Sequence, residues 1–268
     1  MNDRESLFAE PRRDINIADC QFYHTMDLPS YGLVTAHPGA GGWGMRGKED
    51  DFLGHVELSG KRLLEVGPAS GFLTFAAEKC GAEVVSIEAT EGYKYDIVPF
   101  PGAETIWHQA TRLAWKPVTN AYWFAHQCFK SHARVHYGDA YAIPQALGRF
   151  DIALLSNVLL HNRDPLKILQ SSASLTEHTI IVVDVLDQDL ENLGKPVLQF
   201  IPNPAPEPGR EEWNSWWRFS TCFFENALRI LGFAYFSKHF FTAKCGNYDC
   251  PLFTLVACRR AIIYPASK

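Results

Sequence analysis

The stretch Lys61-Arg-Leu-Leu-Glu-Val-Gly-Pro-Ala-Ser-Gly71 decides the fold of this chain. Arg62 to Val66 is an apolar run broken by one acid and followed by glycine, which predicts a short buried strand. Gly67 to Gly71 predicts a tight turn, and Phe72 to Cys80 predicts the helix after it. Such a turn offers bare backbone N–H groups and a helix N-terminus, so it suits a carboxylate or phosphate ligand.

A second strand is predicted at Glu83-Val-Val-Ser-Ile-Glu88, and it ends in an acid. Strand, turn, helix and strand form a βαβ unit, in which the two strands are parallel. Glu88 follows Gly67 by about 20 residues, the separation at which a doubly wound sheet places a carboxylate for the hydroxyls of a ribose. The pattern therefore predicts a nucleoside site. The alternative is a βαβ unit whose glycines serve only the turn.

The dinucleotide fingerprint G-x-G-x-x-G is the main competitor, and it fits poorly. Gly67-Pro-Ala-Ser-Gly71 places Ala69 at the second glycine and Phe72 at the third. A large side chain at Phe72 would hinder the close helix–strand contact that the third glycine permits. Because Glu88 is compatible with it, a nicotinamide-dependent oxidoreductase is kept as an alternative from another functional class.

The same turn resembles motif I of class I S-adenosylmethionine-dependent methyltransferases, (E/D)-x-G-x-x-x-G, with Glu65, Gly67 and Gly71 as the matching residues. The resemblance covers about residues 60 to 260. It implies an α/β fold with a doubly wound, mostly parallel, seven-stranded Rossmann-like sheet and an antiparallel carboxyl-terminal edge. It also implies S-adenosylmethionine as cofactor, with these three residues at its methionine end and Glu88 at its ribose.

The chain has 268 residues and a net charge of −5, with acids and bases interspersed. This balance argues mildly against a nucleic-acid partner, because such binders usually carry a basic face. No apolar run approaches a membrane span, and the first 19 residues contain no apolar signal segment. The seven cysteines are odd in number and scattered, which favours free thiols and a cytoplasmic location.

We predict a cap at residues 1–58 and a methyltransferase domain at residues 59–268, with insertions at 93–134 and 186–219. The second insertion begins with an irregular stretch at 186–210. Loops of this length are often lids or partner surfaces, so a homodimer through this insertion is left open.

The predicted cap is rich in aromatic residues and glycine. Residues 36–46 predict no regular element, and residues 47–58 predict a short helix. One interpretation is a flexible cover over a substrate pocket, with side chains of the cap touching the substrate. The other is a surface extension held by its aromatic side chains. The candidate substrate contacts are Tyr23, Tyr31, His37 and Trp43.

Arg134 to Tyr137 predicts a short strand, closed by Gly138-Asp139-Ala140. The resemblance implies that Asp139 accepts the adenine amino group and that the Ala140 backbone N–H faces the ring. The alternative is an Asp-capped turn. Before this strand, residues 120–130 have helical spacing and an aromatic stripe, which is more typical of core than of a ligand site.

Phe150 to Leu155 is the clearest buried strand, and it leads into Asn157-Val-Leu-Leu-His-Asn-Arg-Asp-Pro-Leu166. This stretch resembles the branch that contains tRNA wobble-uridine carboxymethyltransferases and many small-molecule methyltransferases. The resemblance implies that Ser156, Asn157 and His161 border the reaction centre. His161 is the leading candidate for a general base, and His24 on the cap is a further one. The alternative for His161 is a cofactor contact or simple packing.

No catalytic metal is expected, because hard cations prefer carboxylate oxygens and the strand before Ser156 ends without one. Cys245 and Cys250 are close in sequence, but no second pair completes a zinc site. In the second insertion, Trp213, Trp216 and Trp217 form either an aromatic wall for the substrate, with Trp217 as the candidate contact, or a core patch that ties the insertion to the sheet. Arg218 beside them is a candidate partner for an acidic group on the substrate.

Two strands after a final helix would form the reversed edge that the resemblance implies. Ser220 or Thr221 predicts the N-cap of a helix over 223–231. Residues 233–243 and 251–259 predict the two strands, with a cysteine-bearing loop between them.

The sequence thus predicts a methyltransferase that uses S-adenosylmethionine and a small-molecule acceptor, by metal-independent in-line displacement. A tRNA-directed enzyme is the alternative in the same superfamily, opposed by the net acidity of the chain. A non-catalytic cofactor-binding module is a third interpretation.

Overall fold

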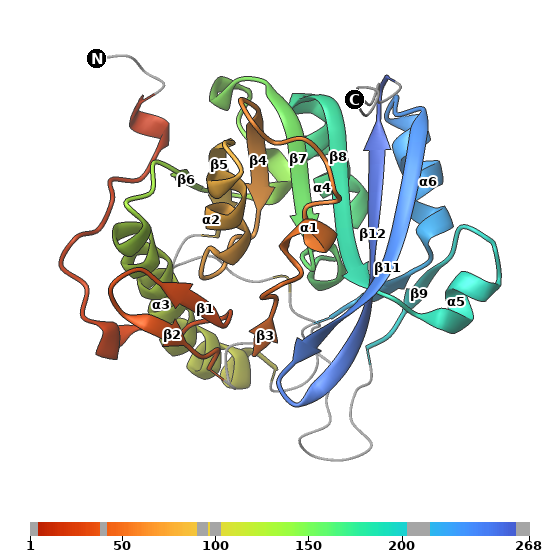
Figure 1. The fold of residues 1–268 in the computed structure, drawn as a ribbon. Helices are drawn as coiled ribbons and strands as arrows, with labels where there is room; N and C mark the ends of the chain where they lie inside the picture. Colours follow the sequence, from red (N-terminus) through yellow and green to blue (C-terminus); the bar gives the residue numbers. More distant parts are fainter. Residues whose placement is uncertain (1–4, 38–41, 90–95, 97–102, 203–214, 261–268) are drawn as a thin grey trace.

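The computed structural model describes residues 5–37, 42–89, 96, 103–202 and 215–260, with only the backbone of 103–114. Its centre is an eight-stranded sheet with the strand order β3-β11-β12-β8-β7-β4-β5-β6 (Figure 1). The parallel strands are β4 (Arg62–Val66), β5 (Glu83–Glu88), β6 (Arg134–Tyr137), β7 (Phe150–Ser156) and β8 (Thr176–Val185). The antiparallel strands at one edge are β12 (Tyr248–Cys258), β11 (Tyr235–Cys245) and β3 (Trp43–Gly44).

The first strand of the parallel set lies inside the sheet, between β5 and β7. The chain therefore proceeds outward from β4 in one direction and then returns to build the other half. At such a switch point the loops leaving neighbouring strands diverge, and a crevice opens at the carboxyl ends. The predicted doubly wound sheet with its reversed edge is confirmed, with β3 as an additional short strand.

Helices cover both faces of the sheet. The helices are α1 (Glu49–Phe52), α2 (Phe72–Lys79), α3 (Ala103–Phe129), α4 (Pro165–Leu175), α5 (Gln188–Asn192) and α6 (Thr221–Ile230). Buried side chains of α1, α2 and α3 share one core with the near face of the sheet in Figure 1, and those of α4 and α6 share a second core with the far face. A ligand site can therefore form only at the ends of the strands, because helices cover both faces of the sheet.

Short 3-10 turns and two-stranded antiparallel pairs lie outside the main sheet and its helices. The 3-10 turns are η1 (Glu5–Leu7), η2 (Ile17–Asp19), η4 (Ala140–Ala142), η5 (Gln145–Leu147) and η6 (Leu159–His161). Two small antiparallel pairs are β1 (Met26–Leu28) with β2 (Gly32–Val34), and β9 (Leu198–Phe200) with β10 (Trp217–Phe219).

Strand alternation explains why the two cores are separate. In β8, Ile181 and Val183 enter the core with α2 and α3, whereas Ile180 and Val182 enter the core with α4 and α6. All four side chains are fully buried, as expected for a central strand with both faces covered. The apolar runs of β7 and β8 were therefore sufficient to predict their place.

Local signals fix the helix ends. The Ser220 hydroxyl accepts a hydrogen bond from Phe223 N at 3.2 Å, which confirms the predicted N-cap of α6. Asp164 caps α4 by accepting from Lys167 N at 3.0 Å, with Pro165 in the first turn.

Four sequence-based expectations are wrong. Residues 36–46 contain a strand after all, because Trp43 and Gly44 pair with the exposed edge of β11. The helix predicted over 47–58 is only α1, four residues long. The stretch 186–210 contains α5 and β9, and α5 is nucleated by the Asp187 carboxylate, which accepts from two backbone N–H groups.

The fourth concerns Cys245 and Cys250. They do not sit in a loop: Cys245 ends β11 and pairs with Tyr248, and Cys250 lies within β12 and pairs with Ala243. All seven cysteines are free thiols.

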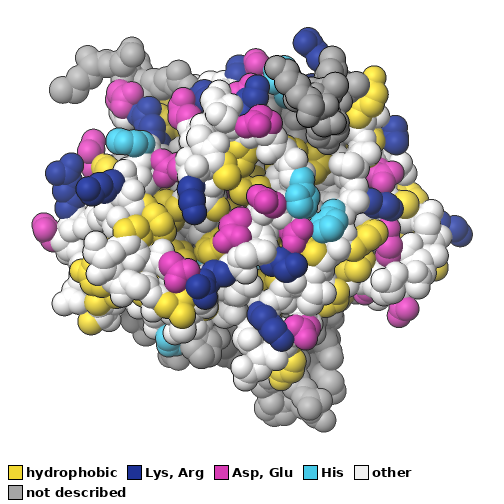
Figure 2. Space-filling view, viewed as in Figure 1, with side chains coloured by type: hydrophobic (Ala, Val, Ile, Leu, Met, Phe, Trp, Pro, Cys, Tyr) yellow, Lys and Arg dark blue, Asp and Glu magenta, His cyan; other side chains and the backbone are white. Residues whose placement is uncertain are grey.

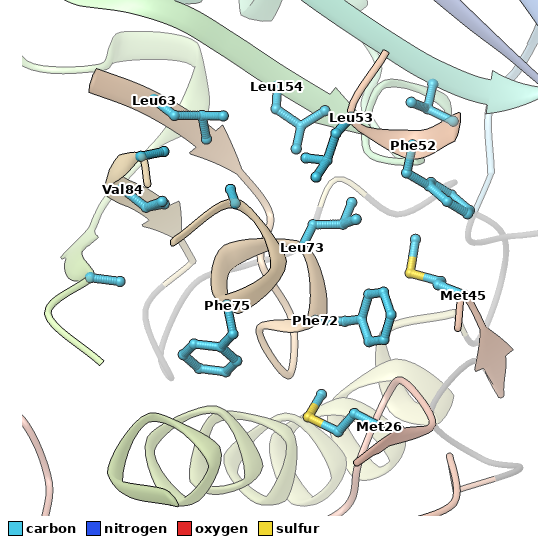
Figure 3. Packing of buried hydrophobic residues seen from close by; sticks show 14 of the residues in the cluster. Met26, Met45, Phe52, Leu53, Leu63, Phe72, Leu73, Phe75, Val84 and Leu154 are labelled. Carbon is cyan, nitrogen blue, oxygen red and sulfur yellow. The ribbon is translucent and has the colours of Figure 1, made fainter. Parts of the chain in front are cut away.

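The helix α2 is the centre of the first core. Figure 3 shows Leu73 pointing toward Leu53 and Leu154, Phe72 toward Met45, and Phe75 toward the long helix α3. A packed α2 holds the preceding turn against the sheet. Within the part of the chain described above, no helix combines the length and apolar character that crossing a membrane requires.

Candidate functional site

The turn after β4 is held in a conformation that needs glycine. Gly67 and Gly71 have φ angles of +75° and +86°. A Cβ on Gly71 would lie 2.5 Å from the Phe75 ring, and a Cβ on Gly67 would lie 3.2 Å from Val158. Gly67 N donates to Ile87 O at 2.9 Å and so extends the β4–β5 ladder into the turn. Both glycines are thus required by backbone geometry and by close neighbours.

Glu88 joins the tip of β5 to this turn. Its carboxylate accepts from Ala69 N at 3.2 Å and from Ala89 N at 2.7 Å. Only 8% of the residue is exposed, and burial raises the pKa of the carboxyl to about 7, against the opposing effect of these hydrogen bonds. Each carboxylate oxygen has a second lone pair, so hydroxyl donors can still bind it.

Glu65 acts behind the turn. Its Oε2 accepts from the hydroxyls of Thr74 at 2.5 Å and Ser86 at 3.0 Å. Burial raises the pKa of this carboxyl to about 7, and the two hydroxyl donors oppose the rise. The side chain therefore ties α2 to β5, which positions the turn. The predicted contact of Glu65 with the methionine end stays a prediction.

The amino-terminal segment is anchored to the same turn through Ser70. The Ser70 Oγ accepts from Tyr23 N and His24 N, both at 3.1 Å, and lies 3.0 Å from His24 Nδ1. Tyr23 packs beside Ala69, and burial raises its pKa, with nearby Glu88 adding to the rise. The segment thus lies directly over the glycine turn.

His24 is held in this anchor and is almost fully buried. Burial lowers the pKa of its imidazole to about 3, so the ring is neutral at physiological pH. Its hydrogen bond to Ser70 gives it a positioning role, and its predicted part in catalysis stays a prediction.

Three further predicted contacts of the cap lie in different surroundings. Trp43 belongs to the first core and is 8% exposed, with its backbone N donating to Tyr23 O at 3.1 Å. His37 and Tyr31 are exposed. Trp43 therefore packs the cap onto the sheet, and contact of any of these residues with substrate stays a prediction.

The loop after β6 lies next to Glu88. Gly138 N donates to Glu88 O at 2.9 Å, which brings the following residues to the tip of β5. The Asp139 carboxylate accepts from Tyr141 N at 2.8 Å and caps η4. That geometry is the capped turn foreseen as the alternative. The roles of Asp139 and Ala140 toward adenine stay predictions.

Unpaired polar atoms gather after β7. Ser156 Oγ and Asn157 Oδ1 are buried and have no hydrogen-bond partner among the described residues. Asn157 has a left-handed φ of +49°, and its backbone N donates to Val183 O at 2.8 Å. Val158 contacts the glycine turn. The residues after β7 therefore lie against the turn that follows β4.

Asp184 was missed by the sequence analysis. It is the penultimate residue of β8 and is 1% exposed, with Oδ1 accepting from Val185 N at 2.8 Å and Oδ2 lacking a partner among the described residues. Burial raises the pKa of this carboxyl to about 7, while Val185 N and the Arg218 guanidinium oppose the rise. An acid closing an apolar strand was the available signal.

The segment around β10 contacts the residues that follow β7. Ser215 Oγ lies 3.3 Å from His161 Nδ1, and Trp217 Nε1 donates to Asn162 O at 3.0 Å. Trp216 is buried, and Trp217 and Arg218 are half-buried. Trp213 lies outside the described residues. The structure thus brings Ser215 and Trp217 beside the residues His161 and Asn162, and it places Arg218 near Asp184.

Asp96 connects three distant segments of the chain, and no sequence signal pointed to it. Its carboxylate accepts from Tyr141 Oη at 2.5 Å and Arg163 N at 2.6 Å, and it pairs with the Arg163 guanidinium. Its backbone O accepts from Trp216 Nε1 at 2.5 Å. One residue therefore links η4, the start of α4 and β10.

A known protein family and several solved structures are similar to this chain. The profile of the methyltransferase domain family matches residues 48–248. A search among curated proteins gives no significant match. Magnesium protoporphyrin IX methyltransferase from Synechocystis PCC 6803, with bound S-adenosylhomocysteine, is 15% identical with a TM-score of 0.50, covering 80% of each chain. The N-terminal domain of EvdMO1, in the presence of S-adenosylhomocysteine and D-fucose, is 19% identical with a TM-score of 0.49, covering 80% of this chain and 84% of that one. At such identities only the fold is shared.

Proposed function

This chain belongs to the methyltransferase domain family, and from that membership we propose that it transfers a methyl group from S-adenosylmethionine to a small-molecule acceptor. The observation that supports this most is the hydrogen bond from Ala69 N to the Glu88 carboxylate. It brings the group suited to a ribose into contact with the turn suited to an amino-acid tail. A nucleoside with such a tail would be held at both points.

The cofactor contacts follow from this arrangement. The backbone N–H groups of the Gly67–Gly71 turn would face the carboxylate of the methionine end. Glu88 would accept the ribose hydroxyls, and Asp139 and Ala140 would lie at the adenine. The buried, unpaired Ser156 Oγ and Asn157 Oδ1 leave polar capacity at the centre of the crevice, as a bound polar ligand requires.

Bound S-adenosylmethionine supplies a methyl carbon already activated by positive sulfur, so the protein mainly contributes alignment and exclusion of water. The proton of a hydroxyl or amine acceptor then needs a base. His161 is one candidate, since it is half-buried beside Ser215. Asp184 is the other, since its Oδ2 has no hydrogen-bond partner in the part of the chain that the structure describes and it ionises as pH rises through its raised pKa of about 7. The proposed transfer uses no metal.

The acceptor would lie between the amino-terminal segment and β10. Trp217 and Arg218 both belong to β10, and Arg218 is close enough to Asp184 to affect its pKa. An acceptor with an acidic group would be held by Arg218 through a charge-assisted hydrogen bond. An acceptor without one would rely on the aromatic wall.

The acceptor class rests on charge. The net charge is −5, and on the face in Figure 2 acidic and basic side chains are interspersed rather than gathered into a basic stripe. Phosphate backbones are bound through such stripes. We therefore place a small molecule ahead of tRNA as acceptor.

Two measurements test the proposal. Calorimetric titration with S-adenosylhomocysteine and with NAD should show binding of the first and no binding of the second. Transfer of labelled methyl from S-adenosylmethionine should then appear in a library of hydroxyl, amine and carbon acceptors. Binding of NAD alone would contradict the proposal, and labelled tRNA with strongly salt-dependent affinity would move the enzyme to the tRNA-directed class.

A further inference from the structure

Three potential metal ligands gather where α1 meets β11. Asp51 Oδ1 lies 3.2 Å from His55 Nε2 and 3.0 Å from His239 Nε2. The three ligand atoms all lie within 4.8 Å of one another. On the face where α1 and β11 are seen in Figure 1, Figure 2 shows histidine side chains beside acidic ones. The cluster belongs to no part of the cofactor crevice.

The local backbone is shaped to hold this arrangement. Asp51 and His55 are four residues apart, and His55 has a left-handed φ of +53°, an uncommon conformation for a residue with a Cβ. His55 N donates to Asp50 O at 3.0 Å, which fixes the chain reversal after α1. A strained conformation is kept only where surrounding contacts enforce it.

Those contacts come from the sheet beneath. Thr254 Oγ1 donates to Asp51 O at 2.6 Å, and the fully buried Phe52 meets the Phe241 ring edge-on at 5.0 Å. Gly54 lies so close to Val256 that a Cβ there would be 2.6 Å from its methyl group. The position of Asp51 relative to β11 is therefore rigid.

The spacing suits a tetrahedral ion. Ligand atoms about 2.1 Å from a tetrahedral zinc ion lie about 3.4 Å from one another. The separations of 3.0 and 3.2 Å from Asp51 Oδ1 lie close to that value, and the two imidazole nitrogens lie within 4.8 Å of each other, so side-chain rotations would bring the three ligand atoms to it. Lys48 contacts the other oxygen, Oδ2, at 3.4 Å and leaves Oδ1 to the imidazoles.

We propose that Asp51, His55 and His239 bind a divalent transition-metal ion, with Zn²⁺ as the best fit. Two imidazole nitrogens and one carboxylate oxygen are a typical zinc ligand set, with water at the fourth position. The ion would cross-link the segment before β4 to the antiparallel edge of the sheet, so its role is structural.

This site is independent of the proposed methyl transfer. In the sheet order, β12 and β8 lie between β11 and β7. Three strand spacings separate His239 from the polar atoms at the end of β7 by about 14 Å. The ion would therefore not reach the reacting groups.

The test uses chelator-treated, metal-free protein titrated with Zn²⁺ and with Co²⁺ at neutral pH. We expect one ion per wild-type chain and a higher melting temperature with Zn²⁺. His239→Asn and His55→Asn should each weaken binding by at least about tenfold and abolish the melting shift. Asn is chosen at His55 because it tolerates the left-handed conformation.

The matched control is His178→Asn. His178 is exposed and lies 3.9 Å from a single aspartate, Asp151, so its loss should change nothing. The Co²⁺ complex should lack the thiolate charge-transfer band that binding at cysteines would produce. No binding to wild type, unchanged affinity in both cluster variants, or a thiolate band would each overturn the proposal.

Discussion

At the scale of single residues, three buried carboxyl groups stand out: Glu65, Glu88 and Asp184. Burial raises the pKa of each to about 7. In the unfolded chain these groups return to their ordinary, lower pKa values. Between the two values the folded state binds more protons, so folding stability falls as pH rises through about 7. These three buried carboxyl groups therefore lower the folding stability at neutral and alkaline pH.

Replacing Asp184 by asparagine should reveal this cost. Above pH 7 the wild-type carboxylate is ionised and buried, whereas the amide is neutral and keeps an oxygen for Val185 N. At about pH 8 we expect the free energy of unfolding of Asp184→Asn to exceed that of wild type by up to a few kcal/mol, and its melting temperature to be higher. At about pH 5 we expect little difference between the two proteins. Thermal denaturation at both pH values measures it.

Asp249→Asn, an exposed carboxylate on the β11–β12 hairpin, is the control and should show no such pH-dependent gain. A melting temperature for Asp184→Asn that is equal to or below wild type at the higher pH would show that the Asp184 charge is compensated.

At the scale of elements, the amino-terminal segment is joined to the glycine turn by one hydroxyl. Ser70 is fully buried and accepts from two backbone N–H groups of the segment. Ser70 therefore contributes to the order of residues 20–37, together with the core packing of Phe22, Met26 and Leu28.

Removing the hydroxyl in Ser70→Ala leaves two buried donors unpaired. The expected cost is about 2 to 6 kcal/mol of stability, because each of the two buried unpaired groups costs about 1 to 3. Hydrogen exchange should accelerate in residues 20–37 more than in α4. Ser59→Ala, at an exposed serine, should leave exchange unchanged. Equal protection of residues 20–37 in both variants would show that other contacts hold the segment.

The elements also show what the sequence could and could not reveal. The bounds of β4, β5 and β6 were predicted residue for residue, because apolar runs there end in glycine or an acid. β3 could not be predicted, since two residues carry no periodicity and their pairing with β11 is set by tertiary contact.

The site was predictable where local motifs mark it and not where distant segments meet. Gly67, Gly71 and Glu88 are recognisable from spacing in one βαβ unit. Asp96 lies in an insertion without a motif, and its partners come from η4, α4 and β10. The contacts of Asp96 form only when these distant segments meet in the folded chain.

At the scale of the whole molecule, the amino-terminal segment is part of the domain core. Phe22, Met26, Leu28, Trp43 and Met45 are all buried in the core that contains α2 and α3. β3 from this segment also extends the main sheet. The predicted boundary at residue 58 is thus crossed by both the sheet and the core.

A shortened chain beginning at Lys48, where the family match starts, should not fold stably. Five buried apolar side chains contribute about 1.5 to 3 kcal/mol each, which together rivals the total stability of a typical domain. We expect loss of the cooperative melting transition and increased binding of a hydrophobic dye. A chain beginning at Glu5 is the control. A cooperative transition near the wild-type temperature in the chain from Lys48 would mean that the cap is separable.

The central claim is that the glycine turn and Glu88 together hold S-adenosylmethionine. Its most direct test is calorimetric titration of S-adenosylhomocysteine into wild type, Glu88→Gln and Glu83→Gln, the last at the exposed start of the same strand. We expect the dissociation constant to rise about tenfold or more in Glu88→Gln, since a hydrogen bond to a charged group contributes about 1.5 to 3 kcal/mol, and to stay unchanged in Glu83→Gln. An unchanged dissociation constant in Glu88→Gln would contradict the claim.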